Sequence, residues 1–318
     1  KNLIKFNNPF ILGSEINEIS NTINKKELIG PDNYIKKCEL LISKQLLCKK
    51  VLLTSSATDA LEMACILSGF KKDDEVIMPS FNFPSSATAV LRCGATPVFV
   101  NVNKENLNIS ADEIQESITK KTRGIIIVHY AGISCDMKAI SNIAKKNSII
   151  LIEDAAHAIY SKFKKKYLGT IGNFGVISFH QTKNILCGEG GALLVNKKKD
   201  FARSDIIREK GTNRKRFIDG KVSKYSWVDN GSSFIPSSLQ AAFLYNQLKQ
   251  GKLITRKRKS IFKIYDKFFN NFKHKDIFLP NYKLLEKGNG HFFWVLVRSK
   301  KRNLFIKNAL SLNIELTS

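Results

Sequence analysis

Short apolar runs recur along the first two-thirds of the chain, and stretches of helical length separate several of them. The runs with the character of buried strands are residues 51–53, 75–79, 97–102, 124–129, 149–153, 176–179 and 192–195. Helices are predicted over 111–118 and 137–146, and after Thr54, where hydroxyl side chains can cap a first turn. Strands that alternate with helices predict an α/β fold with a mostly parallel central sheet, flanked on both faces by helices.

The pattern changes near residue 245. A long basic amphipathic helix is predicted over 252–272, followed by a loop with Pro280 and Gly288, a strand over 292–298 and a helix over 302–310. We therefore expect a large domain, residues 1–245, and a smaller α+β C-terminal domain, residues 246–318. The last residues, 313–318, have the character of a strand that begins without its partners, so we expect the smaller domain to be truncated in this chain.

Composition narrows the class of protein. The chain has 318 residues, of which 43% are hydrophobic and 25% are charged, and these proportions are ordinary for a soluble globular protein. No apolar run is long enough to span a bilayer, and the first residues lack the layout of a signal peptide. Six cysteines are scattered without a C-x-x-C pair, which disfavours a disulfide framework or a zinc site. We therefore expect a cytoplasmic protein without a bound metal.

The formal net charge of +25 leaves several interpretations open. Dense Lys and Arg would suit a nucleic-acid or membrane-surface binder, and residues 256–259 are the densest stretch. The basic residues are otherwise spread along the chain, and no motif that would recognise a groove of nucleic acid accompanies them. This distribution is typical of a solvated lysine-rich surface. A positive field would also attract a doubly charged nucleotide substrate. We expect neither a nucleic-acid nor a membrane partner, although composition alone does not separate these cases.

Two residues at predicted strand ends suggest cofactor chemistry. Lys183 follows the run 176–179 and precedes the glycine-rich segment 188–191, where close backbone packing is possible. A buried amine of lowered pKa can form a Schiff base with an aldehyde cofactor, although most lysines lie on surfaces. Asp154 ends the run 149–153, and a carboxylate beneath a pyridine nitrogen keeps that nitrogen protonated, although an Asp here could also cap a helix.

Further candidate groups lie near the other strand ends. The segment 55–58 opens a predicted helix with hydroxyls and free N–H groups, which suits a phosphate as well as plain capping. Ser178 could add a hydroxyl. Phe83 could stack on a flat ring or pack in the core. His157 could bond a ring hydroxyl or be an ordinary half-buried histidine.

Taken together, Ser56-Ala57-Thr58, Phe83, Glu153–His157, Ser178–His180, Lys183 and Gly188–Gly191 resemble the DegT/DnrJ/StrS family of sugar aminotransferases. The resemblance covers nearly the whole chain and implies the pyridoxal phosphate (PLP) dependent transferase fold type I, with pyridoxal 5'-phosphate as cofactor. It further implies the role of each residue. Lys183 would carry the cofactor as a Schiff base and move the proton, Asp154 would pair with the pyridine nitrogen, and Phe83 would stack on the ring. Ala57, Thr58 and Ser178 would hold the phosphate.

Within the family, segments 51–54, 129–132, 208–214, 225–227 and 230–234 most resemble a subgroup of dTDP-sugar transaminases. This resemblance implies that L-glutamate aminates C4 of dTDP-4-keto-6-deoxyglucose, giving dTDP-4-amino-4,6-dideoxygalactose for surface polysaccharides such as enterobacterial common antigen and O-antigen. The alternatives are a sibling transaminase acting on another nucleotide-linked keto sugar, and a non-catalytic regulatory or nucleic-acid-binding relative. Histidine replaces the lysine in the dehydratases of the family, so Lys183 favours amine transfer.

The resemblance also implies a homodimer with shared active sites. Lys210, Asn213 and Arg214 would then line the sugar pocket of the neighbouring subunit. Ser233 stands where many relatives carry an Asn that reaches the cofactor phosphate of the partner, which leaves that cross-subunit contact open.

Overall fold

A seven-stranded sheet forms the centre of the molecule. The computed structural model describes residues 2–26, 28, 33–269, 272–280 and 288–317. The strand order is β1-β9-β8-β5-β4-β2-β3. The strands are β1 (Val51–Thr54), β2 (Glu75–Pro79), β3 (Thr96–Val100), β4 (Thr122–Val128), β5 (Ile150–Asp154), β8 (Phe174–Ser178) and β9 (Gly191–Val195). Only β9 runs antiparallel to its neighbours, so the predicted mostly parallel α/β sheet is confirmed.

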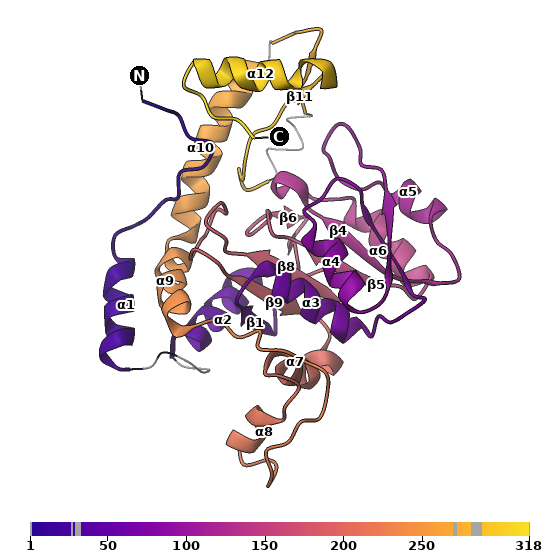
Figure 1. The fold of residues 1–318 in the computed structure, drawn as a ribbon, viewed down its shortest axis with the longest axis vertical. Coiled ribbons are helices and arrows are strands. Elements are labelled where there is room, and N and C mark those ends of the chain that lie inside the picture. The colour runs from indigo at the N-terminus through magenta and orange to yellow at the C-terminus, as the bar shows by residue number, and fades with distance from the viewer. Residues whose placement is uncertain (1, 27, 29–32, 270–271, 281–287, 318) are drawn as a thin grey trace.

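Helices cover both faces of this sheet (Figure 1). They are α1 (Glu15–Asn24), α2 (Asn33–Leu46), α3 (Ala57–Ser68), α4 (Ser85–Arg92), α5 (Ala111–Glu116), α6 (Met137–Lys146), α7 (Phe201–Arg208), α8 (Arg214–Ile218), α9 (Ser238–Lys249), α10 (Gly251–Phe269) and α12 (Ser299–Ser311). Short 3₁₀ turns occupy Tyr130–Gly132 and Lys198–Asp200, and β6 (Lys162–Phe163) and β7 (Lys166–Tyr167) form a separate hairpin.

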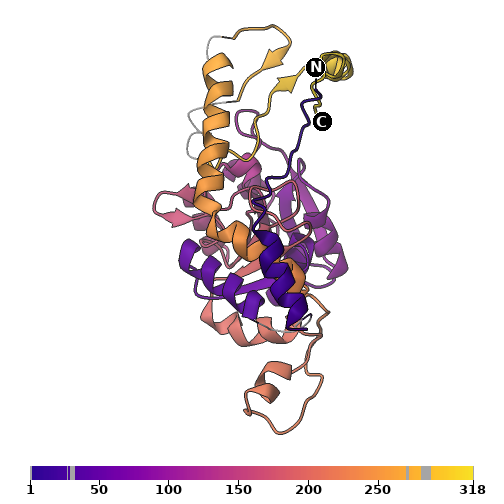
Figure 2. The same cartoon turned by 90° about the vertical axis from the view of Figure 1, so that its left-hand side faces the viewer.

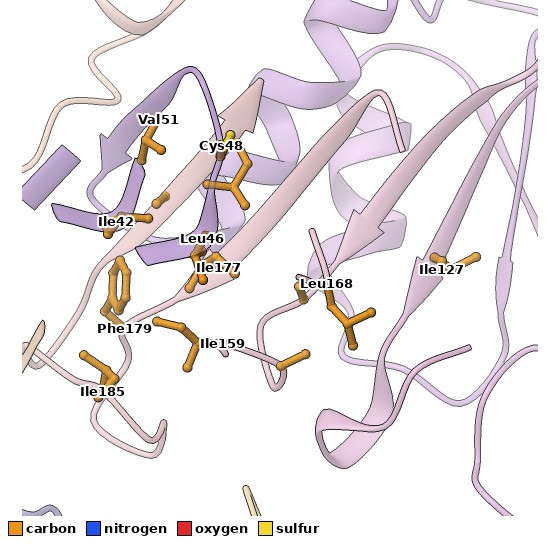
Figure 3. Close-up of a cluster of buried hydrophobic side chains, with 14 of the residues drawn as sticks. Ile42, Leu46, Cys48, Val51, Ile127, Ile159, Leu168, Ile177, Phe179 and Ile185 are labelled. Atoms are coloured by element: carbon orange, nitrogen blue, oxygen red, sulfur yellow. The ribbon is translucent and has the colours of Figure 1, made fainter. Parts of the chain in front are cut away.

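The alternation of side chains along the strands divides the core into two layers. On β4, Ile125 and Ile127 join a cluster with α2, α6 and α9, whereas Ile126 joins a cluster with α3, α4 and α7. Successive side chains of a strand point to opposite faces, so a central strand such as β4 contributes to both layers. Figure 3 shows part of the first cluster, where Phe179 and Ile177 lie beside Ile42 and Leu46.

The last third differs in detail from the sequence prediction. Helix α10 spans Gly251–Phe269, and α12 contains the helix predicted over 302–310. The strand predicted over 292–298 is shorter: only Leu296–Val297 forms a strand, β11, which pairs antiparallel with β10 (Ile277–Phe278). The rings at 292–294 instead pack against Ala131, Ile133 and Phe262. Part of the predicted loop, 281–287, lies outside the described residues, as do 270–271.

The chain ends meet each other beside α12. Ile4 forms a parallel bridge with Ile314, and its N–H donates to Asn313 O at 2.8 Å. Figures 1 and 2 show both ends of the chain close to this helix. The strand-like residues at the end of the sequence therefore have a partner, which is the N-terminal segment. The division of the chain at residue 245 stays a prediction.

Helix α10 is the longest described helix, and none in the described ranges combines the length and apolar character needed to cross a bilayer. All six cysteines are free thiols.

Candidate active site

The ends of three neighbouring strands meet at one edge of the sheet. Thr54 ends β1, Ser178 ends β8, and Gly191, the first residue of the antiparallel strand β9, pairs with both. Asp154 ends β5 next to β8, where its register partner is Val176. Because parallel strands end at the same edge, residues far apart in the sequence are brought together there.

The first turn of α3 forms an anion site at this edge. The side chain of Ser56 caps the helix by accepting from Asp59 N–H at 3.0 Å. Between this cap and Asp59 lie Ala57 and Thr58, whose N–H groups have no acceptor in the described part of the chain. The positive end of the helix dipole lies at the same place, so a phosphate would find both donors and favourable charge.

Glycine at position 191 allows this helix end to approach the sheet closely. A Cβ atom there would lie 2.4 Å from Ser56 O and 2.5 Å from Ala57 N. The hydroxyls of Thr58 and Ser85 lie 2.7 Å apart beside the turn, and Ser178 is buried at the neighbouring strand end. The hydroxyl of Ser178 accepts from His180 N–H at 3.3 Å. Gly191 thus brings its register partner Ser178 and the start of α3 to the same edge of the sheet.

Asp154 is a buried carboxylate at the centre of this edge. Its Oδ1 accepts from Ala156 N–H at 3.0 Å and its Oδ2 accepts from the Ser86 hydroxyl at 3.3 Å. Burial raises the pKa of Asp154, while the Ala156 N–H, the charge of Lys183 and the Ser86 hydroxyl oppose that rise. A cationic nitrogen placed against this carboxylate would relieve the cost of its burial.

Lys183 and His157 lie within electrostatic reach of each other. Burial lowers the pKa of Lys183, and the Asp154 carboxylate opposes this. Burial, followed by the charge of Lys183, holds the pKa of His157 well below its usual range. The Nδ1 atom of His157 is buried and has no hydrogen-bond partner among the described residues. A neutral ring with an unsatisfied nitrogen is suited to bind a hydroxyl group of a ligand.

Arg258 and His291 hold the backbone of Lys183 and the side chain of Asn184 in place, and neither Arg258 nor His291 was predicted from the sequence. Arg258 of α10 donates to Lys183 O at 3.4 Å and to His291 O at 3.1 Å. Nδ1 of His291 lies 2.9 Å from Oδ1 of Asn184, and its ring lies 4.6 Å from that of His157. These partners are 75 and 107 positions apart in the sequence, so no local pattern could have identified them.

Glu153, next to Asp154, has a structural role. It is fully buried, and its Oε1 accepts from the N–H groups of Ile171 and Gly172 at 2.6 Å each. Its Oε2 accepts from Gly169 N–H at 2.9 Å and lies 3.0 Å from Nε2 of His129. Because adjacent side chains of a strand face opposite sides, Glu153 ties the loop 169–172 to β5 while Asp154 faces the site.

The remaining predicted residues lie further out. Phe83 is 75% exposed in this single chain, on the segment that leads into α4. Ser233 is exposed, and the next residue, Phe234, accepts from Ser55 N–H at 3.0 Å. The residue after Ser233 therefore contacts the segment just before α3.

The segment with the predicted sugar-binding residues projects from the body of the molecule around α8 (Figure 1). Arg214 pairs with Glu209 at 3.0 Å, Asn213 donates to Lys224 O, and Lys210 is exposed. No hydrogen bond or ion pair in the described ranges joins these residues to Lys183.

These groups match the parts of pyridoxal phosphate. The open N–H groups of Ala57 and Thr58 suit the phosphate, Asp154 suits the pyridine nitrogen, His157 suits the ring hydroxyl and Lys183 suits the aldehyde. Among the described residues, no group of three or more His, Cys, Asp or Glu side chains is placed to hold a metal ion.

Comparisons with known proteins agree with this geometry. A model of the DegT/DnrJ/EryC1/StrS aminotransferase family matches residues 11–316. Protein MJ1066 of Methanocaldococcus jannaschii is 32% identical over 314 residues, which cover 96% of this chain and 80% of that protein. GDP-perosamine synthase of Escherichia coli O157:H7 is 30% identical over 312 residues, which cover 95% of this chain and 80% of that protein.

Among solved structures, the PLP form and the PMP form of Spr1654 from Streptococcus pneumoniae each superpose with a TM-score of 0.89 at 25% identity, covering 98% of this chain and 83% of that one. The strand order, the strand-end site and the family match over nearly the whole length lead to one conclusion. The chain belongs to the DegT/DnrJ/EryC1/StrS aminotransferase family, and it is a sugar aminotransferase that depends on pyridoxal phosphate.

Proposed function

We propose that this chain moves the amino group of L-glutamate to C4 of dTDP-4-keto-6-deoxyglucose. Glutamate becomes 2-oxoglutarate, and the sugar ketone becomes the amine of dTDP-4-amino-4,6-dideoxygalactose. The observation that carries the transamination is the position of Lys183 within electrostatic reach of Asp154, which ends β5 at the edge of the sheet that also holds the open anion site. Burial lowers the pKa of Lys183 there. The assignment of the sugar depends on the segments 51–54, 129–132, 208–214, 225–227 and 230–234, which resemble the dTDP-sugar subgroup.

Each side chain then has a defined task. When bound, pyridoxal phosphate supplies an aldehyde carbon that exchanges amino groups and a ring that withdraws electrons. Lys183 anchors that group. When its amine is free, burial favours the neutral form, which takes the proton from the amine-bearing carbon of glutamate and becomes an ammonium. In the second half of the reaction, the ammonium form of Lys183 delivers a proton to C4 of the sugar and returns to the neutral amine.

The residues around Lys183 hold the cofactor in place. Asp154 keeps a proton on the ring nitrogen by its negative charge, and His157 bonds the ring hydroxyl. Ala57 and Thr58 donate their N–H groups to the phosphate, and the hydroxyls of Ser56 and Ser178 lie beside it.

Phe83 and the projecting segment point to a two-chain assembly. Phe83 is 75% exposed in one chain, and we propose that it covers the ring face in the loaded dimer. Lys210, Asn213 and Arg214 would bind the nucleotide sugar of the neighbouring subunit, and Ser233 would lie at the same boundary. We propose a cytoplasmic homodimer, in keeping with nucleotide-linked substrates.

The anchoring role of Lys183 is tested by absorption and mass spectrometry. Purified protein with pyridoxal phosphate should absorb visible light, and borohydride should fix the cofactor to the peptide that carries Lys183. Lys183→Ala should lose both signals, whereas Lys138→Ala, an exposed lysine of α6, should keep them. Unchanged absorption in Lys183→Ala would refute the assignment.

The sugar is tested by product analysis. The enzyme should aminate dTDP-4-keto-6-deoxyglucose with glutamate as donor, faster than GDP-linked or UDP-linked 4-keto-6-deoxy sugars. The likeness to GDP-perosamine synthase favours a GDP-linked keto sugar as the second candidate. Amination of the GDP-linked sugar alone would establish that candidate and overturn the dTDP assignment.

A further inference from the structure

A basic cavity lies between α10 and the β6–β7 hairpin. Its volume is about 490 Å³, within the usual range for small-molecule sites. Among the described residues, its charged lining consists of Lys162, Lys252, Arg256, Lys259 and Lys263, without an acidic side chain. Figure 2 shows the hairpin projecting on the side of the molecule away from α12.

The cations of α10 form one stripe because of their spacing. Lys252, Arg256, Lys259 and Lys263 follow intervals of four, three and four residues (256 − 252, 259 − 256, 263 − 259), so they repeat on one side of the helix. Arg258 lies about 200° around the helix from Arg256 and donates to Lys183 O instead. The basic cavity and the candidate active site therefore use different sides of α10.

The uncharged part of the cavity is built by aromatic and amide side chains. Tyr160 donates its hydroxyl to Oε1 of Gln45 at 2.8 Å, and Gln45 in turn donates to Leu248 O at 3.0 Å. Gly251 lets α10 approach, because a Cβ atom there would lie 2.3 Å from the Tyr160 hydroxyl. The hydrogen bonds hold the floor of the cavity in place without a ligand.

Four of the cations around this floor have no carboxylate partner among the described residues. Lys162, Lys252, Arg256 and Lys263 pair with no carboxylate within 4.0 Å in the part of the chain that the structure describes. Lys162 instead stands 4.3 Å from the centroid of the Tyr167 ring. Cations gathered around a concave site without counter-charges repel one another, so a bound anion would lower the free energy of the folded protein.

We propose that this cavity is a binding site for a small anion that carries a diphosphate group. Arg256 offers a planar fork that matches phosphate oxygens, and Lys162, Lys252 and Lys263 contribute point charges around it. The rings of Tyr160 and Tyr167 provide a wall for an organic substituent. A concave site of this size suits a small molecule better than a duplex, whose phosphates need an extended surface.

The test is calorimetric titration of the cofactor-loaded protein with inorganic pyrophosphate, phosphate and acetate. Pyrophosphate should bind more tightly than phosphate, acetate should not bind, and affinity should fall with added salt. The double variant Lys252→Ala/Arg256→Ala should weaken pyrophosphate at least about tenfold, since it removes two charge-assisted contacts. Arg256→Lys keeps the charge and should lose less.

Two matched variants make the result specific. Lys300→Ala/Lys301→Ala removes the same charge from the exposed first turn of α12 and should leave pyrophosphate affinity unchanged. Lys210→Ala/Arg214→Ala alters the proposed nucleotide-sugar contacts and should also leave it unchanged. The proposal is overturned if pyrophosphate does not bind, if only the Lys210 and Arg214 variant weakens it, or if DNA binds and pyrophosphate does not compete.

Discussion

Gly191→Ala tests the anion site at the start of α3 most directly. The added methyl group would lie 2.4 Å from Ser56 O and 2.5 Å from Ala57 N. Both are backbone atoms, which cannot rotate away as the end of a side chain can. The helix start must therefore move away from β9, and the open N–H groups of Ala57 and Thr58 must move with it.

The size of the effect follows from these distances. Ordinary contact begins at 3.4 Å, so the helix start must shift by about 1 Å. Overpacking of this kind costs about 1–3 kcal/mol of folding free energy. Misplacing one hydrogen bond to a charged phosphate costs about 1.5–3 kcal/mol, and this corresponds to about 10- to 150-fold in the cofactor dissociation constant.

The assay is a titration of cofactor-free protein with pyridoxal phosphate, followed by visible absorption, with melting temperature measured in parallel. Gly188→Ala is the matched control, because a Cβ atom there meets nothing within 4 Å although φ is +85°. That variant should lose about 1 kcal/mol of stability through backbone strain and keep its cofactor affinity. If Gly191→Ala binds pyridoxal phosphate as tightly as wild type, the phosphate does not lie at this helix start.

Three further predictions concern the carboxylates and Lys183. Burial raises the pKa of Asp154 in the folded state, so wild-type cofactor-free protein should lose stability relative to Asp154→Asn as pH rises from about 4 toward 7; a difference in urea midpoints that is independent of pH would contradict this. Glu153→Gln puts an amide N–H₂ against backbone N–H donors and should cost about 2–3 kcal/mol in urea unfolding, and an unchanged midpoint would argue against the buried network. Burial lowers the pKa of Lys183, so acylation of cofactor-free protein should modify it at lower pH than exposed lysines. Asp154→Asn removes the negative charge that raises the pKa of Lys183, so acylation of Lys183 should then begin at a still lower pH. If mass spectrometry shows that acylation begins at a higher pH in this variant, the effect assigned to Asp154 has the wrong sign.

The strands were predictable because the signal is local. Apart from the edge strand β3, where Phe99 is 56% exposed, the strands of the sheet are largely buried on both faces. Six of the seven strands run parallel to one another, an arrangement that requires such apolar runs. The predicted strand over 292–298 was mostly wrong, because the rings at 292–294 are partly buried against Ala131, Ile133 and Phe262 and do not lie in a sheet. Burial in a loop cluster leaves the same apolar pattern in the sequence as burial in a strand.

Some features of the candidate site were likewise predictable from local sequence, and others were not. The sequence by itself determined that Asp154 ends an apolar strand, that Lys183 follows one and that Ser56 opens a helix, because each signal lies within a few positions of its strand or helix. Only the tertiary structure decided that Gly191 presses against Ser56 and that Arg258 binds Lys183 O, across 75 positions. Contacts of that kind depend on the path of the whole chain, and a local residue pattern does not encode them.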